Sequence, residues 1–578
     1  MRNRLLVRHF LLRFLEHDLV SPNADRREVL SVVGGTLIAV SLFLSTLIAL
    51  QYQFNNFLPP GLTSLRSVDE RFLFVSASML VMALLAVALW DALALDARDA
   101  AVLGILPVPP RVIIRAKFSA IALLAAGTTL AWNFFPVVLR GAAVPVGLRL
   151  GFGDMAVLTL AQAVATLGAG IFGFLSVFSL REVLTALMGH ERFRILSPAL
   201  QAALVVLLTS ALLLLPRSST RMASTWIAPN RIAANALPPL WFVGLHETLA
   251  GSVLDRLPRT KPPRYLAAQE RDATTLYRSL WPRYRELGRW TLEALVIVTV
   301  LAIGACAWNN RRLPAAIRSR RLHTPGVHVV WNWTITHFVA RSALELAAFF
   351  FTLQTLTRRI THRAVVASAM AVGLSLIVVT AGGGAVTMLA AQSLLVASLL
   401  TGFRHAIEFP AELRSSSTFR LAFTGQRAPY LSGVKRAGFV GVVLPALVLL
   451  SMWHAAEFGV RVAMLHFATG SAFSILMMNL LFLRYRRLPL VSAYVPHADL
   501  KSRAPAYVAV LVTAAYALAW AEQSALAAGT TYFFVLLIVL VGLTASVTAL
   551  DRAWSATATV TDLDEELPLP TQRLNLAG

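Results

Sequence analysis

The stretch DARDAAVLGILPVPPRVIIRAK, residues 96–117, lies between two long apolar runs and carries too much charge to lie in lipid itself. Charged residues open it, a proline-rich corner follows, and a basic amphipathic turn ends it. Because proline fixes φ and removes a backbone donor, the corner predicts a rigid bend between two short helices. These features are Asp96, Arg98 and Asp99, then Leu106, Pro107, Val108, Pro109 and Pro110, and finally Arg111, Arg115 and Lys117.

A related stretch, PAELRSSSTFRLAFTGQRAPYLSGVKR, occupies residues 410–436. Both stretches follow an apolar hairpin and precede a long apolar run. Nineteen positions separate Arg98 from Lys117, and twenty-one separate Arg414 from Lys435. A single copy would equally fit an ordinary re-entry loop rich in turn-forming residues. Two copies in corresponding positions favour a repeated cytoplasmic element that receives force from a partner.

The composition is that of a membrane protein. Charged residues are 14% and hydrophobic residues 57% of the 578 residues, whereas a soluble chain carries about 25% charged residues. Many apolar runs reach spanning length, and only helices satisfy their own backbone hydrogen bonds over such runs in lipid. The predicted fold class is therefore all-α, a polytopic helical membrane protein. The net charge of +23 lies almost entirely between the apolar runs, so we expect no nucleic-acid partner.

Twelve transmembrane helices in two six-helix halves fit these runs. The predicted spans are 29–50, 73–93, 117–138, 154–178, 197–216 and 290–308, then 364–381, 385–403, 437–455, 462–483, 505–522 and 530–550. An amphipathic segment of the kind that lies in the membrane interface precedes each half, at 4–19 and 343–359. A cytoplasmic cap packed on the helix bundle fits 4–19 equally well. The predicted domains are an interfacial helix in 1–28, a first half in 29–310 with a long outer loop at 217–289, a cytoplasmic linker with a second interfacial helix in 311–362, a second half in 363–550, and a disordered tail in 551–578.

The positive charges predict the orientation. With both termini cytoplasmic, the inside segments carry 35 lysines and arginines and the short outside loops carry five. The other twelve lie in the 217–289 loop, which is too long for the positive-inside rule to apply. The chain is therefore expected in a cytoplasmic (inner) membrane, with an even number of spans.

These features resemble the permeases of ABC-2 type exporters. In that family a basic amphipathic helix leads into six spans, and a short coupling helix after the second span often ends in an L-P-V corner. The corresponding segments here are 4–19 and Leu106-Pro107-Val108. The family also has helical elements on the outer side before the last span, for which LPPLWFVGLHETL, residues 237–249, is the candidate. The second half lacks the L-P-V corner and has Phe423-Thr424-Gly425 near its place.

The resemblance implies a bacterial exporter permease with both membrane halves fused in one chain. Its partners would be the lipid bilayer and a separate cytosolic ATPase dimer that pushes on both coupling segments and alternates access to a path between the halves. No lysine follows a glycine, so the chain has no P-loop, and we expect no enzymatic activity, catalytic residue, cofactor or metal. The expected ATPase-coupling residues are Asp96, Arg98, Asp99, Leu106, Pro107, Val108 and Pro110 in the first copy, and Glu412, Arg414 and Arg420 in the second.

Two other functions stay open. A secondary transporter also has two six-span halves, but it would need an ion-coupling charge deep in a span, and Asp91, Asp154 and Glu293 lie at predicted span ends. A membrane-embedded enzyme or assembly factor could act through the 217–289 loop, which shows no recognisable active-site spacing. The remaining acidic and histidine clusters are expected to be solvated side chains rather than metal sites: His246-Glu247, His405 with Glu408, and His454 and Glu457 with Arg461 and His466.

Overall fold

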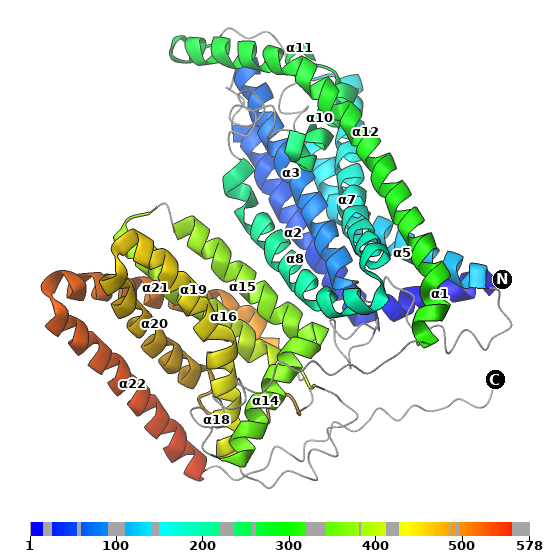
Figure 1. Ribbon diagram of the computed structural model, residues 1–578. Helices are drawn as coiled ribbons and strands as arrows, with labels where there is room; N and C mark the ends of the chain where they lie inside the picture. Colours follow the sequence, from blue (N-terminus) through cyan, green and yellow to red (C-terminus); the bar gives the residue numbers. More distant parts are fainter. Residues whose placement is uncertain are drawn as a thin grey trace. The chain divides into compact units, whose positions relative to one another are not determined.

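The computed structural model describes residues 2–15, 26–54, 59–90, 110–141, 150–219, 235–256, 262–318, 342–380, 383–411, 427–485, 487–492 and 498–557. Every regular element in these ranges is a helix (Figure 1), and none of them contains a strand. The prediction of an all-α chain is therefore confirmed.

The described helices support a multi-pass membrane protein. Eleven of the described helical segments are long and apolar enough to cross a membrane. The predicted span 29–50 falls in α2 (Arg26–Phe54), where the described apolar part is the shorter stretch Leu37–Leu50. The count of twelve spans and the direction of insertion therefore stay predictions.

The chain forms two compact units, Met1–Arg321 and Leu322–Gly578, and each contains a hydrophobic core of its own. The elements of the first, unit 1, are α1 (Arg2–Leu15), α2, α3 (Pro60–Ala88), α5 (Pro110–Phe135), the π-helical turn η1 (Pro136–Arg140), α7 (Phe152–Met188), α8 (His190–Ser219), α10 (Pro238–Ala250), α11 (Val253–Arg256), the 3₁₀ turn η3 (Arg264–Leu266) and α12 (Ala267–Arg318).

Helix α3 lies at the centre of unit 1, packed against α7, α8, α10 and α12. The close approach of α7 depends on small residues, since Ala165 and Ala169 are fully buried. A Cβ atom at Gly173 would collide with the backbone carbonyl of Met79 on α3. The spacing of these three residues by four positions predicts helix packing, and the structure confirms that role.

The predicted outer loop 217–289 is mostly helical in its described part. It contains α10, α11, η3 and the first turns of α12, a single helix of 52 residues. A buried stripe explains why α12 starts so early: apolar residues at spacings of three and four face α10 and α3. These residues are Ala273, Tyr277, Leu280, Tyr284 and Leu287. The helix expected at 237–249 is confirmed as α10.

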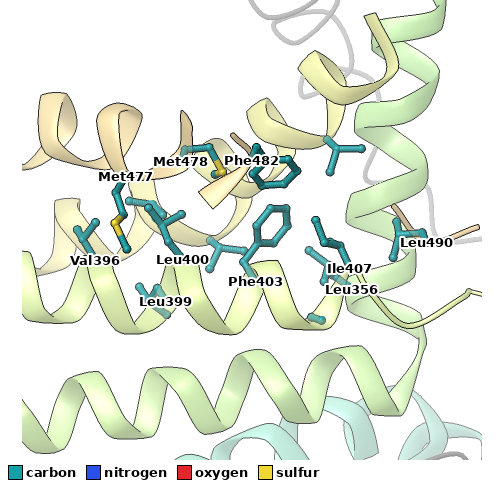
Figure 2. Packing of buried hydrophobic residues seen from close by; sticks show 14 of the residues in the cluster. Leu356, Val396, Leu399, Leu400, Phe403, Ile407, Met477, Met478, Phe482 and Leu490 are labelled. Carbon is teal, nitrogen blue, oxygen red and sulfur yellow. The ribbon is translucent and has the colours of Figure 1, made fainter. Parts of the chain in front are cut away.

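The second unit, unit 2, is built around α16. Its elements are α14 (Ala343–Arg358), α15 (Ile360–Thr380), α16 (Ala385–Ala406), α18 (Arg427–Gly438), the π-helical turn η4 (Phe439–Val443), α19 (Leu444–Phe458), α20 (Val460–Leu481), α21 (Ala498–Ala528) and α22 (Thr530–Thr557). Helix α16 packs against α15, α20 and α21. Figure 2 shows Phe403 of α16 pointing toward Phe482, with Leu400 beside Met477 and Met478.

Several predicted boundaries need correction. The helix α22 continues to Thr557, so the first seven residues of the predicted disordered tail are helical, and 558–578 lie outside the described residues. The predicted linker 311–362 includes the end of α12 and all of α14. The predicted interfacial segments 4–19 and 343–359 contain α1 and α14.

The two units share a packing order. In each, the first helix packs against the helix that follows the predicted coupling segment: α1 against α5, and α14 against α18. In each, the helix before that segment is central and packs against the fourth and fifth long helices of its unit. These contacts are α3 with α7 and α8, and α16 with α20 and α21. The sixth long helix then packs against the fourth, as α12 on α7 and α22 on α20.

A π-helical turn beside a proline interrupts the third long helix of each unit. Pro136 begins η1, and Pro445 follows η4 by two residues. Proline cannot donate a backbone hydrogen bond, so the register of the helix shifts locally. In unit 1 the carbonyl of Trp132, four residues before Pro136, accepts a hydrogen bond from the Ser41 hydroxyl of α2 instead.

Candidate functional site

The predicted coupling residues fall almost entirely outside the described residues. Pro110 is the exception, as the first residue of α5, a position where proline's fixed φ suits a helix start. The structure does describe where each coupling segment leaves its unit and where it returns. We call that end of each unit the proximal end, and the opposite end the distal end. The residues outside the description are Asp96, Arg98, Asp99, Leu106, Pro107, Val108, Glu412, Arg414 and Arg420.

Helix α8 anchors the point where the first coupling segment leaves unit 1. Trp90, the last described residue before the segment, is fully buried. Its indole Nε1 donates a hydrogen bond of 2.8 Å to the Ser197 hydroxyl, and its ring stacks on Phe193 with centroids 6.2 Å apart. The Gln201 amide donates to the carbonyl of Val87 at 3.0 Å. These contacts join the end of α3 to α8.

The return into α5 is joined to the amphipathic helix α1. Phe10 of α1 is only 1% exposed, and the Lys117 ammonium lies 5.7 Å from the centre of its ring. Lys117 is itself buried. A cation held over an aromatic face inside a packed contact ties α1 to α5.

In unit 2 a small folded turn holds the start of the second coupling segment. The backbone N–H of Ala411 donates to the carbonyl of Leu490, and the N–H of Leu490 donates to the carbonyl of Ile407, both at 2.8 Å. The Tyr430 hydroxyl of α18 donates to the carbonyl of Pro489, also at 2.8 Å. The turn thus connects the residues on both sides of the segment, 407–411 and α18.

Arg404 is the charged centre of this turn. Its guanidinium carbon lies 4.1 Å from the centre of the Tyr485 ring, and the group pairs with Glu408 at 2.5 Å. Burial raises the pKa of the Glu408 carboxyl, but the hydrogen bond from His405 and the charge of Arg404 outweigh it and leave that pKa below its ordinary value. Burial also raises the pKa of Tyr485. Glu408 is therefore ionised at neutral pH and the Arg404–Glu408 pair is charged on both sides.

Helix α14 packs on α18 through a buried carboxylate. Glu345 accepts a hydrogen bond from the Ser432 hydroxyl and pairs with Arg436 at 3.2 Å. At Gly433 a Cβ atom would collide with the Glu345 carbonyl oxygen, so only glycine permits this approach. The amphipathic helix of unit 2 is thus joined to the helix that follows the coupling segment, as in unit 1.

The distal end of unit 1 contains a buried ion pair that the sequence does not indicate. His246 and Glu247 were expected to be solvated, and this is wrong: they are 1% and 0% exposed. Glu247 of α10 pairs with Arg71 of α3 and accepts a hydrogen bond of 2.7 Å from the Tyr277 hydroxyl of α12. These contacts join three helices. The sequence shows charged residues within apolar segments. It does not show that Arg71 pairs with Glu247, which lies 176 positions further along the chain.

Glu270 caps the start of α3 at the same end. Its carboxylate accepts the backbone N–H groups of Gly61 at 2.7 Å and Leu62 at 3.1 Å. The first N–H groups of a helix have no partner within the helix, and Pro59 offers no side-chain cap here. Glu247 and Glu270 therefore both have partners on neighbouring helices.

A second buried ion pair lies at the proximal end of unit 1. Arg181 pairs with the neighbouring Glu182 on α7, and both residues are less than 10% exposed. The Asn309 amide of α12 donates to the Glu182 carboxylate at 2.8 Å. This pair fixes α12 against α7 where α12 leaves the unit.

The histidines of unit 2 also differ from expectation. His454 and His466 were expected to be solvated and are instead 0% and 1% exposed. His466 lies 2.9 Å from both carboxylate oxygens of Glu522, which is also buried. His405, by contrast, has a side chain 44% exposed. In the described part of the chain no group of three or more His, Cys, Asp or Glu side chains is placed to hold a metal ion.

No protein-family model, curated protein or solved structure matches the chain. The features from which we propose a function are the contacts at the ends of the two predicted coupling segments and the buried charged clusters.

Proposed function

We propose that the chain is the membrane permease of an ABC-2 type exporter, driven by a separate cytosolic ATPase dimer. The observation that carries the proposal is the shared packing order of the two units. In both, a segment of corresponding position leaves the helix bundle after the central helix and returns into the helix on which the amphipathic helix packs. The family resemblance assigns coupling to the same two segments.

Each anchored end would convert a push on the coupling segment into helix movement. In unit 1 the push reaches α3 and α8 through Trp90, and α5 and α1 through the contact of Lys117 with Phe10. In unit 2 it reaches α16 and α18 through the turn around Arg404. Packed cores move as bodies rather than deform continuously, so such a push would shift each bundle between discrete arrangements.

The buried ion pairs of unit 1 would keep that unit stiff during the movement. The Arg71–Glu247 pair links α3 and α10, and the Arg181–Glu182 pair is linked to α12 through Asn309. Breaking a buried pair leaves an uncompensated charge, so these contacts persist through a conformational cycle. Helix α12 would then transmit a displacement from the proximal end of unit 1 to its distal end.

The test is a charge exchange in the first coupling segment. The double variant Arg98→Asp/Asp99→Arg keeps the composition and should abolish co-purification of a P-loop ATPase from the native host in mild detergent. ATP turnover of the isolated complex should fall with it. The matched control is the exchange Arg66→Glu/Glu70→Arg, which reverses a partly exposed pair on α3 3.1 Å apart.

The control variant should retain the ATPase, and both variants should elute as the wild-type protein does in size-exclusion chromatography. An ATPase that stays bound to the Arg98/Asp99 variant would refute the coupling assignment. A wild-type complex with no ATPase, under conditions that preserve other membrane complexes of the host, would refute the exporter.

A secondary transporter is the second candidate, because the structure buries a carboxylate and a histidine between helices of unit 2. Glu522 and His466 join α21 to α20, and buried ionisable groups in membrane helices mark ion pathways. Transport that continues in vesicles without ATP, collapses with the proton gradient and is lost in Glu522→Gln would favour this candidate over the exporter.

A further inference from the structure

Three buried side chains at the distal end of unit 2 each present an electron-pair donor atom without a hydrogen-bond partner in the described structure. They are Nδ1 of His454, Nε2 of His466 and Oε1 of Gln392, and the three residues are 0%, 1% and 1% exposed. A buried polar group without a hydrogen-bond partner destabilises the fold, and native proteins retain few of them. Three in one cluster call for a ligand.

The three side chains are neighbours. The rings of His454 and His466 lie perpendicular with centroids 4.6 Å apart. The Gln392 amide nitrogen donates to the backbone carbonyl of His466 at 2.7 Å, which fixes which end of the amide carries the oxygen. A Cβ atom at Gly470 would collide with Gln392, so glycine at that position makes room for the amide.

The partners of the two rings determine where their protons are. Nδ1 of His466 faces both oxygens of Glu522 at 2.9 Å, and carboxylate oxygens are acceptors, so we place the hydrogen on Nδ1. Nε2 of His454 faces the carbonyl of Met388 at 3.4 Å and carries the hydrogen for the same reason. The unpartnered nitrogen of each ring therefore holds a lone pair, and neither can satisfy the other.

This is the arrangement found around metal-bound histidines. Such a histidine donates its second ring N–H to a carboxylate or a backbone carbonyl, which fixes its tautomer and orients its free nitrogen. Here the ring of His466 has the Glu522 carboxylate as its partner, and the ring of His454 has the Met388 carbonyl. The packing of the unit sets the position of each ring, because the side chains come from four helices. These are Gln392 of α16, His454 of α19, His466 of α20 and Glu522 of α21.

We propose that His454 and His466 bind a transition-metal ion that prefers imidazole nitrogen, of the class of Zn²⁺. Glu522 and the Met388 carbonyl orient the two ligands, and Gln392 Oε1 is a candidate for a third. Two histidines and a neutral amide leave coordination positions for water, as in an open rather than a closed zinc site. Mg²⁺ and Ca²⁺ do not fit, because both take oxygen ligands.

The experiment is Zn²⁺ binding to the full-length protein, purified in detergent through a tag that contains no histidine. After treatment with a chelator and equilibrium dialysis against Zn²⁺, we expect one ion per chain by elemental analysis. The variants His454→Gln and His466→Gln should each lose it. Glu522→Gln should weaken binding by about 10–100-fold, the usual effect of removing such an orienting partner. His405→Gln, at an exposed histidine of the same unit, is the control and should bind as the wild-type protein does.

A second measurement needs no variant and so does not depend on variant folding. Co²⁺ bound by nitrogen ligands at low coordination number absorbs visible light far more strongly than hydrated Co²⁺, and Zn²⁺ should displace it and remove the band. The absence of stoichiometric Zn²⁺, or a Co²⁺ spectrum like that of the hydrated ion, would overturn the proposal and leave a buried water or a proton as the occupant. Equal binding in wild type and both histidine variants would also overturn it. None of these results bears on ATPase association.

Discussion

The distal ends of the two units differ in the partners of their buried polar side chains. In unit 1 the end is covered by α10 and the early part of α12, and its buried charges are matched within the unit: Arg71 with Glu247, and Glu270 with the start of α3. In unit 2 the described helices end in short turns, and the buried groups there keep unpartnered lone pairs on His454 and His466. One packing order therefore carries a buried ion pair at the distal end of unit 1 and histidines with unpartnered ring nitrogens at the distal end of unit 2.

The difference shows what buried polarity does in each unit. A buried ion pair holds helices in place, because removal of either partner leaves an uncompensated charge. Buried acceptor atoms without partners contribute little to the stability of the fold. Their presence in a native structure is explained where a bound ligand uses them. We therefore expect the stability of unit 1 to depend on its buried ion pair and that of unit 2 to depend little on its buried histidines.

The largest effect is expected from Arg71→Met, which leaves Glu247 buried without its cation. The free energy of unfolding in mixed detergent micelles should fall by about 3–5 kcal/mol. The double variant Arg71→Met/Glu247→Met should recover most of that loss, because an apolar pair of similar volume leaves no buried charge. A loss below about 1 kcal/mol, typical of exposed pairs, would show that the pair is solvated and that the two distal ends are alike.

A smaller effect is expected at the contact of the amphipathic helix in unit 2. Gly433→Ala introduces a Cβ atom against the Glu345 carbonyl oxygen, and overpacking of this kind costs about 1–3 kcal/mol. Gly542→Ala is the matched control, since nothing lies within 4 Å of a Cβ atom there, and alanine should stabilise that helix by about 0.5–1 kcal/mol. Equal unfolding free energies for the two variants would mean that α14 does not pack on α18 as described.

A structural feature can be predicted from the sequence when it depends on residues that lie close together in the chain. Apolar runs, the helix at 237–249 and the stripe of Ala165, Ala169 and Gly173 follow from residue spacing along one segment, and the structure agrees with them. The pairing of Arg71 with Glu247 depends on which helix faces meet after folding, and no local pattern shows that. His466 and Glu522 were missed in the same way, since a histidine next to a predicted turn looks solvated until α21 is packed against it.

The smallest effect is expected from Glu522→Gln in metal-free protein. The glutamine keeps the shape and can accept from Nδ1 of His466, so the loss is that of one weakened hydrogen bond, about 0.5–1.5 kcal/mol. His466 can remain neutral without its carboxylate, whereas Arg71 cannot lose its charge, and this is why the two substitutions differ. The measurement is the same unfolding free energy, with chelator present. A loss as large as that of Arg71→Met would mean that His466 and Glu522 form a structural ion pair, and the contrast between the two distal ends would disappear.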